Sequence, residues 1–240
     1  ASRSWTPPPE TASQKGAPLE RNRKLVVEFI GMFIFMFTVG MVTEKTGAGT
    51  VAPIAIGFVL MVMVFAGGHI SGGHYNPAVS TAVLIRGRMT GDEWVWYVGT
   101  QLVAAALAGL LVRAIGGHEL AAPVAGQGKM FVVELLFTLA LTYTVLNVAT
   151  ARGTEGNSFY GLAIGGMVLV GAFAVGGVSG GAFNPAIAFG ASITGLFKWS
   201  NIWVYLIAEL IGGAAGAVAF LFVQPEEKLT GDIEAASTGP

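Results

Sequence analysis

The stretch at residues 71–78 reads Ser-Gly-Gly-His-Tyr-Asn-Pro-Ala, and residues 179–186 read Ser-Gly-Gly-Ala-Phe-Asn-Pro-Ala. Asn is favoured as a helix N-cap because its side-chain oxygen accepts a backbone N–H of the first turn. Pro suits the next position, where the backbone N–H has no intrahelical partner. The sequence therefore predicts two helix starts, one at Asn76, Pro77 and Ala78 and the other at Asn184, Pro185 and Ala186.

The rest of the chain is duplicated at the same offset of 108 residues. Residues 55–57 recur at 163–165, Tyr97 recurs as Tyr205, and Gln101 is matched by Glu209. Residues 24–28 match 129–134 with a slip of one or two positions. The chain is thus predicted to be two repeats, residues 24–116 and 129–223, and a repeat of this length excludes a solenoid.

The composition indicates an integral membrane protein. Hydrophobic residues make up 53% of the 240 residues and charged residues only 11%, against about 25% charged in soluble domains. The net charge of −1 gives no reason to expect a nucleic-acid partner, so membrane lipid is the expected surrounding. The absence of cysteine excludes disulfides and thiol catalysis.

Six apolar stretches are long enough to cross a bilayer, which takes about 20 residues each. They are residues 25–43, 51–68, 95–115, 130–149, 160–177 and 202–223. Two stretches of half that length, 76–86 and 184–194, begin at the Asn-Pro-Ala triplets. Because each repeat holds three spans, the second repeat must enter the membrane from the opposite side, as inverted repeats do in transport proteins. The predicted fold is an all-α membrane bundle of six transmembrane helices and two re-entrant half-helices.

The segments before the half-helices are predicted to line a pore. Non-helical backbone at membrane depth is tolerated only where protein or a water-filled cavity surrounds it. The residues concerned are Gly72, Gly73, His74, Tyr75 and Gly180. Two helix N-termini facing one point, each with roughly half a positive charge, would exclude cations and protons. With its oxygen engaged as a cap, the side-chain NH2 of each Asn is expected to be free to donate into the pore.

The ends of the chain are polar, and residues 1–23 and 224–240 are predicted as disordered tails around a single channel domain, residues 24–223. Nine Lys and Arg residues fall on the side of the N-terminus and four on the other side. Because cytoplasmic loops carry the excess of Lys and Arg, both termini are expected to be cytoplasmic.

The paired triplets in two three-span repeats resemble the aquaporin (major intrinsic protein) family, over about 200 residues from Arg23 to Val223. The resemblance implies a homotetramer with one narrow pore per subunit, which conducts water or small neutral solutes passively. The sequence has no Ser/His/Asp set and no phosphate-binding loop, so an enzyme is not expected. It also implies that Glu28 and Glu134 hold backbone N–H groups of the two re-entrant loops. Gln101 and Glu209, the matched pair in the third span of each repeat, are expected to act similarly.

The sequence departs from the family at the predicted selectivity filter. Most water channels have Arg directly after the second triplet, where this chain has Ile187. By spacing, the other filter positions are Ile56, Ala172 and Gly181. A filter without a fixed charge should be wider and more apolar, which admits neutral solutes such as ammonia, carbon dioxide, hydrogen peroxide, urea and glycerol. Alternatively, the apolar side chains could dewet the constriction and reduce water flux.

Two other functions remain open at this point. A secondary transporter also uses inverted repeats with broken helices, and it would show saturable flux coupled to an ion gradient. A poorly conducting structural membrane protein would show negligible flux of every solute. His69 and His74 could suggest a metal site, but no Cys or carboxylate lies near them in sequence, so neither a metal nor a cofactor is expected.

Overall fold

The computed structural model describes residues 18–44, 47–116 and 125–228, and in these ranges it contains helices and no strand. Six long helices are apolar and long enough to cross a membrane. They are α1 (Pro18–Val42), α2 (Ala52–Ser71), α4 (Gly91–Gly116), α5 (Gln127–Thr150), α6 (Tyr160–Ser179) and α8 (Ile202–Val223). Short 3-10 turns η2 (Gly49–Val51), η3 (Arg152–Thr154), η4 (Trp199–Asn201) and η5 (Pro225–Glu227) lie between or after them. The six predicted spans are confirmed.

The two remaining helices, α3 (Pro77–Ile85) and α7 (Pro185–Thr194), have 9 and 10 residues. At about 1.5 Å per residue, each reaches only half-way across a bilayer. Each begins with Pro after an Asn N-cap, as the sequence predicts. The two half-helices enter from opposite sides of the bundle. The end of α3 lies beside η5, which follows α8, whereas α7 leads into η4, which precedes α8. The two half-helices therefore end at opposite ends of α8.

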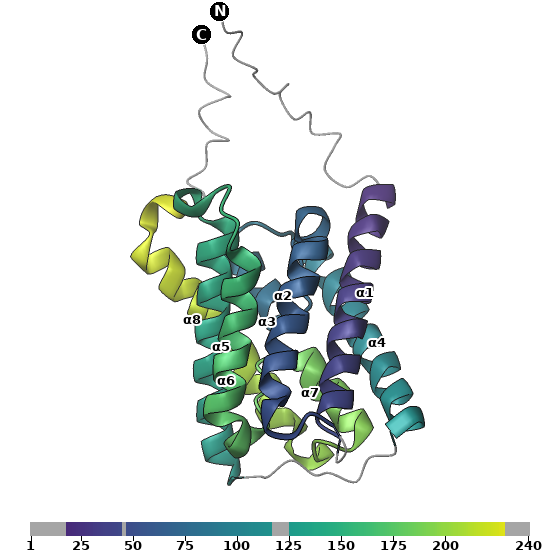
Figure 1. Cartoon of the computed structure of the whole chain (residues 1–240). Coiled ribbons are helices and arrows are strands. Elements are labelled where there is room, and N and C mark those ends of the chain that lie inside the picture. Colours follow the sequence, from purple (N-terminus) through teal and green to yellow (C-terminus); the bar gives the residue numbers. More distant parts are fainter. Residues whose placement is uncertain (1–17, 45–46, 117–124, 229–240) are drawn as a thin grey trace, which may run out of the picture.

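The helices pack as two groups of three that share the half-helices (Figure 1). In the first repeat α1 packs against α2 and α4, in the second α5 packs against α6 and α8, and α2 on α6 joins the two. The half-helices are exchanged, since α3 packs mainly on α8 and α7 mainly on α4. Each repeat therefore holds the half-helix of the other.

The α2–α6 contact depends on glycine at two matched positions. A Cβ added to Gly57 would lie 2.7 Å from the carbonyl oxygen of Gly165, and one added to Gly165 would lie 2.4 Å from that of Gly57. Both distances are shorter than atoms tolerate. Small residues at this crossing let the two backbones touch, which is the usual way in which membrane helices pack closely.

The outer surface of the bundle is apolar. Val218 and Phe222 on α8 are 61% and 83% exposed, and other helices expose Val, Ile, Leu and Phe in the same way. An apolar exterior around a core that contains buried Glu, Gln and Asn side chains suits a protein surrounded by lipid. The protein is an integral, multi-pass membrane protein.

The structure corrects the predicted boundaries of the two polar tails. Residues 18–23, assigned above to the N-terminal tail, are the first turns of α1, where Pro18 and Glu20 suit a helix start. At the other end η5 is ordered, because the carboxylate of Glu227 is bound by Arg86, an interaction between residues 141 positions apart that no local pattern reveals. Residues 1–17 and 229–240 lie outside the described part of the chain.

Candidate pore and its central constriction

Glu28 on α1 holds the loop between α2 and α3. Helix α2 ends at Ser71, and Gly72 follows in the left-handed conformation that favours glycine, with φ of +90°. One carboxylate oxygen of Glu28 accepts from the Ser71 hydroxyl at 2.7 Å and from the backbone N–H of His74 at 2.9 Å. The other oxygen accepts from the backbone N–H of Tyr75 at 2.8 Å. This buried acid satisfies loop donors that helix hydrogen bonds leave open.

Glu134 on α5 does the same for the loop between α6 and α7. It accepts from the Ser179 hydroxyl at 2.6 Å and from the backbone N–H groups of Ala182 at 3.1 Å and Phe183 at 2.8 Å. Gly180 has φ of +97°, which matches Gly72. The two loops therefore have the same architecture, built from residues that occupy equivalent positions in the two repeats.

A strained aromatic residue precedes each Asn. Tyr75 has φ of +46° and Phe183 has φ of +50°, a region that bulky side chains rarely occupy. The ring of Tyr75 is held by close packing, because a Cβ on Gly31 or Gly67 would lie 2.1 or 2.2 Å from its atoms. No pattern in the sequence indicates this conformation, and it turns the carbonyl group of each aromatic residue toward the opposite half of the protein.

The two Asn side chains bind those carbonyls reciprocally. The amide nitrogen of Asn76 donates to the carbonyl oxygen of Phe183 at 2.9 Å, and that of Asn184 donates to Tyr75 at 2.8 Å. Each Asn oxygen caps its own half-helix, with the N–H of Ala78 at 2.8 Å and that of Ala186 at 3.0 Å. This corrects the expectation that the whole NH2 group is free, since one N–H is used and one remains for the pore.

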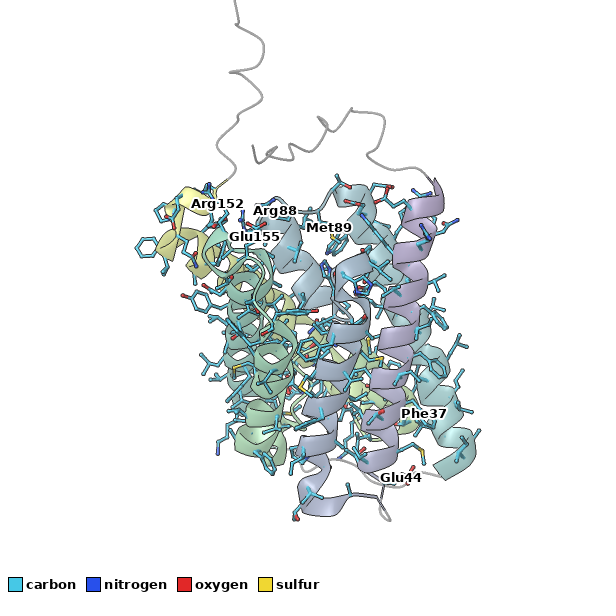
Figure 2. All side chains as sticks on the ribbon, turned by 45° about the horizontal axis from the view of Figure 1, so that its top comes forward. Phe37, Glu44, Arg88, Met89, Arg152 and Glu155 are labelled. Atoms are coloured by element: carbon cyan, nitrogen blue, oxygen red, sulfur yellow. The ribbon has the colours of Figure 1, made fainter. Side chains whose placement is uncertain are left out.

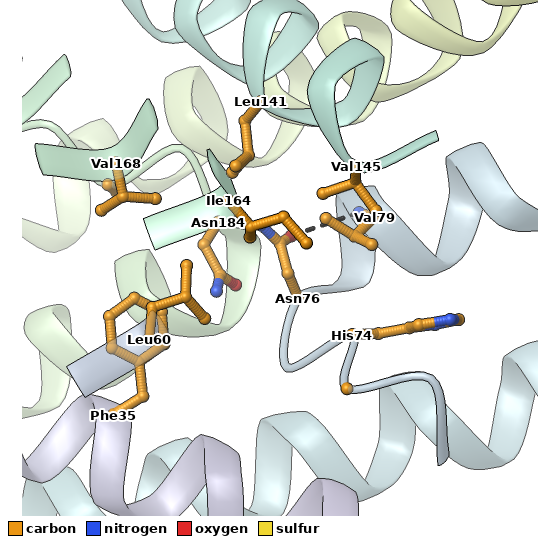
Figure 3. Close-up of a pocket in the computed structure, with 12 residues that line it drawn as sticks. Phe35, Leu60, His74, Asn76, Val79, Leu141, Val145, Ile164, Val168 and Asn184 are labelled. Atoms are coloured by element: carbon orange, nitrogen blue, oxygen red, sulfur yellow. Dashed lines mark hydrogen bonds between the residues drawn. The ribbon is translucent and has the colours of Figure 1, made fainter. Parts of the chain in front are cut away.

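A narrow cavity, which we call the constriction, lies at the Asn pair (Figure 3). Its volume is about 10 Å³, roughly the space that one water molecule requires. Apart from Asn76 and Asn184, most side chains that line it are apolar. The apolar ones are Phe35, Leu60, Val79, Leu141, Val145, Ile164 and Val168. A water molecule here meets hydrogen-bond donors at the two Asn residues and apolar walls elsewhere.

His74 joins this cavity to a larger one. The second cavity has a volume of about 800 Å³, and His74 and Val145 line both. Its rim carries Arg88, Met89, Arg152 and Glu155, which lie at the end of the bundle where α1 begins (Figure 2). We call this cavity the vestibule. Because His74 lines both cavities, it lies where the constriction meets the vestibule, and its ring contacts the Ser80 hydroxyl at 3.0 Å.

The predicted filter residues are only partly brought together. A Cβ on Gly181 would lie 3.5 Å from the Cα of Ala172, so these two positions are neighbours. Ile187 is 3% exposed and packs in the hydrophobic core, and Ile56 packs against that core from α2. None of the four is among the described residues that line the constriction or the vestibule.

Two tyrosines that the sequence analysis did not assign to the site hold the re-entrant loops through hydrogen bonds. The hydroxyl of Tyr97 donates to the carbonyl oxygen of Ser71 at 2.7 Å, and the hydroxyl of Tyr205 donates to that of Ser179. The recurrence of Tyr97 as Tyr205 at the 108-residue offset was the sequence signal that could have identified them. Gln101 also has a defined role, since its amide donates to Glu28 at 2.9 Å.

Six membrane-spanning helices around two half-helices whose N-termini meet at a one-water constriction define a passive membrane channel. The comparisons with known proteins agree, since the family described as Major intrinsic protein matches residues 16–220. The chain is 34% identical over 218 residues to Aquaporin NIP1-4 of Oryza sativa subsp. japonica, which covers 87% of this chain and 78% of the relative. It is 36% identical over 238 residues to Aquaporin TIP4-2 of Zea mays, covering 88% and 90%.

Among solved structures, the aquaglyceroporin from Plasmodium falciparum matches with a TM-score of 0.67 at 20% identity, over 90% of this chain and 99% of that one. That likeness concerns the fold. The chain belongs to the major intrinsic protein family and is a passive channel for water and small neutral solutes.

Proposed function

We propose that solutes pass in single file between Asn76 and Asn184, and that this pair excludes ions and protons. The observation that carries the proposal is the reciprocal bonding of the two Asn amides, which fixes one remaining N–H of each at the constriction. A water molecule that accepts from both cannot also accept from its neighbour in the file. The N-termini of α3 and α7 add positive potential at the same point.

The filter lies beyond the constriction, on the side away from the vestibule, and is formed by Ile56, Ala172, Gly181 and Ile187. The proximity of Gly181 to Ala172 supports this grouping. Three of the four side chains are apolar and the fourth position has none, so the filter has no fixed charge. It therefore discriminates solutes by size and by their cost of dehydration.

The termini face the cytoplasm. Arg21 and Lys24 on α1 pair with Asp92 and Glu93 at the start of α4, so these helices begin at the same end of the bundle. Seven described Lys and Arg residues lie at that end and three at the other. The seven are Arg21, Arg23, Lys24, Arg86, Arg88, Arg152 and Lys228, and the three are Arg113, Lys129 and Lys198. This asymmetry supports a cytoplasmic vestibule.

The chain assembles as a homotetramer through its exposed apolar helix faces, with one pore in each subunit. Val26 and Ile30 on α1, Val103 and Leu107 on α4 and Val132 and Leu136 on α5 supply apolar surface for lipid or for neighbouring subunits. Its activity as a channel does not require catalysis.

Stopped-flow light scattering on proteoliposomes tests the solute class. Osmotic water flux is compared with glycerol and urea uptake, with empty vesicles as the control. Uptake of glycerol or urea at rates comparable to water supports the wide apolar filter. Fast water flux without solute uptake would show a tight filter despite Ile187. Saturable uptake driven by an ion gradient, or no flux of any solute, would contradict a passive channel.

A further inference from the structure

Glu209 is a buried acid in the middle of α8 with an unusual environment. Its side chain is fully buried, and neither carboxyl oxygen accepts a hydrogen bond from a described residue within bonding geometry. The groups beside it are the carboxyl group of Glu134 and the backbone N–H of Asn184. A charged carboxylate without partners at this depth in a membrane protein carries a large free-energy cost. Its protonation state therefore needs an explanation.

The matched position in the first repeat, Gln101, suggests what that protonation state is. Gln101 is also fully buried, and its amide donates to an oxygen of Glu28 at 2.9 Å and to the Ser80 hydroxyl at 3.2 Å. Glu28 thereby accepts four hydrogen bonds. The donors are the Ser71 hydroxyl, the N–H groups of His74 and Tyr75, and the Gln101 amide.

Glu134 accepts only three of the four equivalent bonds. Its donors are the Ser179 hydroxyl and the N–H groups of Ala182 and Phe183. The fourth donor would come from position 209, where the amide of the first repeat is replaced by a carboxyl group. An ionised carboxylate can only accept, whereas a protonated carboxyl group has one O–H donor. Two ionised carboxylates buried side by side would also repel each other.

We propose that Glu209 carries a proton, donates it in a hydrogen bond to Glu134, and so acts as a positioning residue for the second re-entrant loop. The pair is a binding site for a single proton, with Glu134 ionised and Glu209 neutral. When the proton leaves to solvent, no covalent bond other than that O–H changes. The other oxygen of Glu209 remains an acceptor facing the N–H of Asn184.

The other ionisable groups around Glu209 do not neutralise it. Helices α3 and α7, which pack on α8, contain no ionisable side chain, and neither does η4. Besides Glu134, α5 carries Lys129 at its first turn and Tyr143 more than two turns further on. On α8 the nearest group is Tyr205, whose hydroxyl donates to Ser179. The acidic residues of η5 lie at the far end of α8.

The proton matters because Glu134 determines where the Phe183 carbonyl points. Glu134 holds the N–H of Phe183, and the carbonyl of the same residue accepts from Asn76. Loss of the proton would place a second charge beside Glu134 and weaken that arrangement. We therefore expect the stability of the protein to fall as the pH rises through the range in which Glu209 ionises. The effect on flux rests on the proposed conduction past the Asn pair, whereas the effect on stability does not.

Glu209→Gln tests the proposal, because it copies the Gln101 arrangement into the second repeat. The purified full-length protein is melted in detergent between neutral and alkaline pH. We expect Glu209→Gln to melt like the wild type at neutral pH but to lose the alkaline decrease that the wild type shows. Gln101→Glu is the matched control, and it should add alkaline sensitivity by creating the same pair in the first repeat. Identical alkaline profiles for the wild type and Glu209→Gln would overturn the proposal.

Infrared spectroscopy of the wild type provides a second readout, in which the variant serves only to assign the band. A protonated-carboxyl C=O band that disappears at alkaline pH is expected, and a difference spectrum against Glu209→Gln assigns it. Absence of any such band that titrates with pH would contradict a proton at this site. Melting temperatures that rise with sodium or potassium concentration at constant ionic strength would instead indicate a metal cation between the two carboxylates, and would also overturn it.

Discussion

Asn76 and Phe183 belong to different repeats, and the side-chain amide of the first donates to the carbonyl oxygen of the second at 2.9 Å. The symmetric bond joins Asn184 to Tyr75 at 2.8 Å. Each half of the chain thus completes the loop of the other beside the small cavity that Asn76 and Asn184 line. These reciprocal hydrogen bonds, together with those to the buried acids Glu28 and Glu134, keep Tyr75 and Phe183 in their strained conformation with positive φ.

Replacing Asn76 with Asp tests this arrangement. Asp keeps the helix cap but cannot donate to Phe183, whose buried carbonyl then loses its partner at a cost of about 1–3 kcal/mol. It also places a negative charge between the two helix N-termini. We expect a lower melting temperature and a measurable cation leak in proteoliposomes that report proton or potassium flux.

Asn147→Asp is the control for that experiment, because Asn147 lies on α5 outside the Asn pair and donates within its own helix, to Tyr143. It should leave ion exclusion unchanged. An Asn76→Asp protein that excludes cations as well as the wild type would show that Asn76 does not face the pore.

Much of this architecture could be predicted because the repeat and the apolar stretches are strong sequence signals. The half-helix starts at Asn76 and Asn184 follow from local capping chemistry, and the structure has both. What could not be predicted depends on distant contacts. The positive φ of Tyr75 and Phe183 and the bond that consumes one N–H of each Asn arise only when the two repeats meet.

The ordered structure at the C-terminal end of the described chain also depends on a distant contact. Composition alone assigns η5 to a polar tail, yet Glu227 is fixed there by Arg86 at the end of α3. Similarly, Gln101 and Glu209 look equivalent in the repeat. Only the structure shows that Gln101 donates to its acid, whereas Glu209 accepts a hydrogen bond from no described residue at either oxygen.

The glycines at the α2–α6 crossing can be tested in isolation. In Gly165→Ala the new methyl group would lie 2.4 Å from the carbonyl oxygen of Gly57, so the helices must separate. Overpacking of this kind costs about 1–3 kcal/mol. We expect a lower melting temperature in detergent for Gly165→Ala. The neighbouring change Gly166→Ala, where no atom lies within 4 Å of the new Cβ, should be neutral or slightly stabilising. Equal melting temperatures for the two variants would argue against a close crossing.

The proposed filter is tested by Ile187→Arg. A long charged side chain at this position should narrow the passage and add hydrogen-bond donors, so glycerol and urea uptake should fall more than water flux. Ile187→Val is the matched control and should change neither. Stopped-flow measurements on proteoliposomes give both rates for each variant. If water flux and solute uptake fall by the same factor in Ile187→Arg, Ile187 does not belong to the filter.

The ion pair of Glu227 should make the stability of the protein sensitive to acid. Glu227 accepts from the backbone N–H of Arg152 at 2.7 Å and pairs with Arg86 at 2.5 Å. The Arg152 N–H bond, together with the charges of Arg86 and Arg152, holds the pKa of Glu227 below its usual value of about 4.3, although desolvation opposes this. Because the folded state binds this proton more weakly than the unfolded state, the stabilisation is present above that usual value. It is lost as the pH falls through the lower folded pKa.

Glu227→Gln should therefore lower the melting temperature at neutral pH, because it leaves the buried guanidinium of Arg86 without its carboxylate. The difference between the wild type and Glu227→Gln should shrink as the pH is lowered below the usual range of a Glu carboxyl group. Glu226→Gln, at the exposed neighbouring position, should melt like the wild type throughout. A gap between the wild type and Glu227→Gln that stays constant from neutral to acid pH would show that the charge of Glu227 does not stabilise the fold. In that case only the shape of its side chain would matter at the contact between α3 and η5.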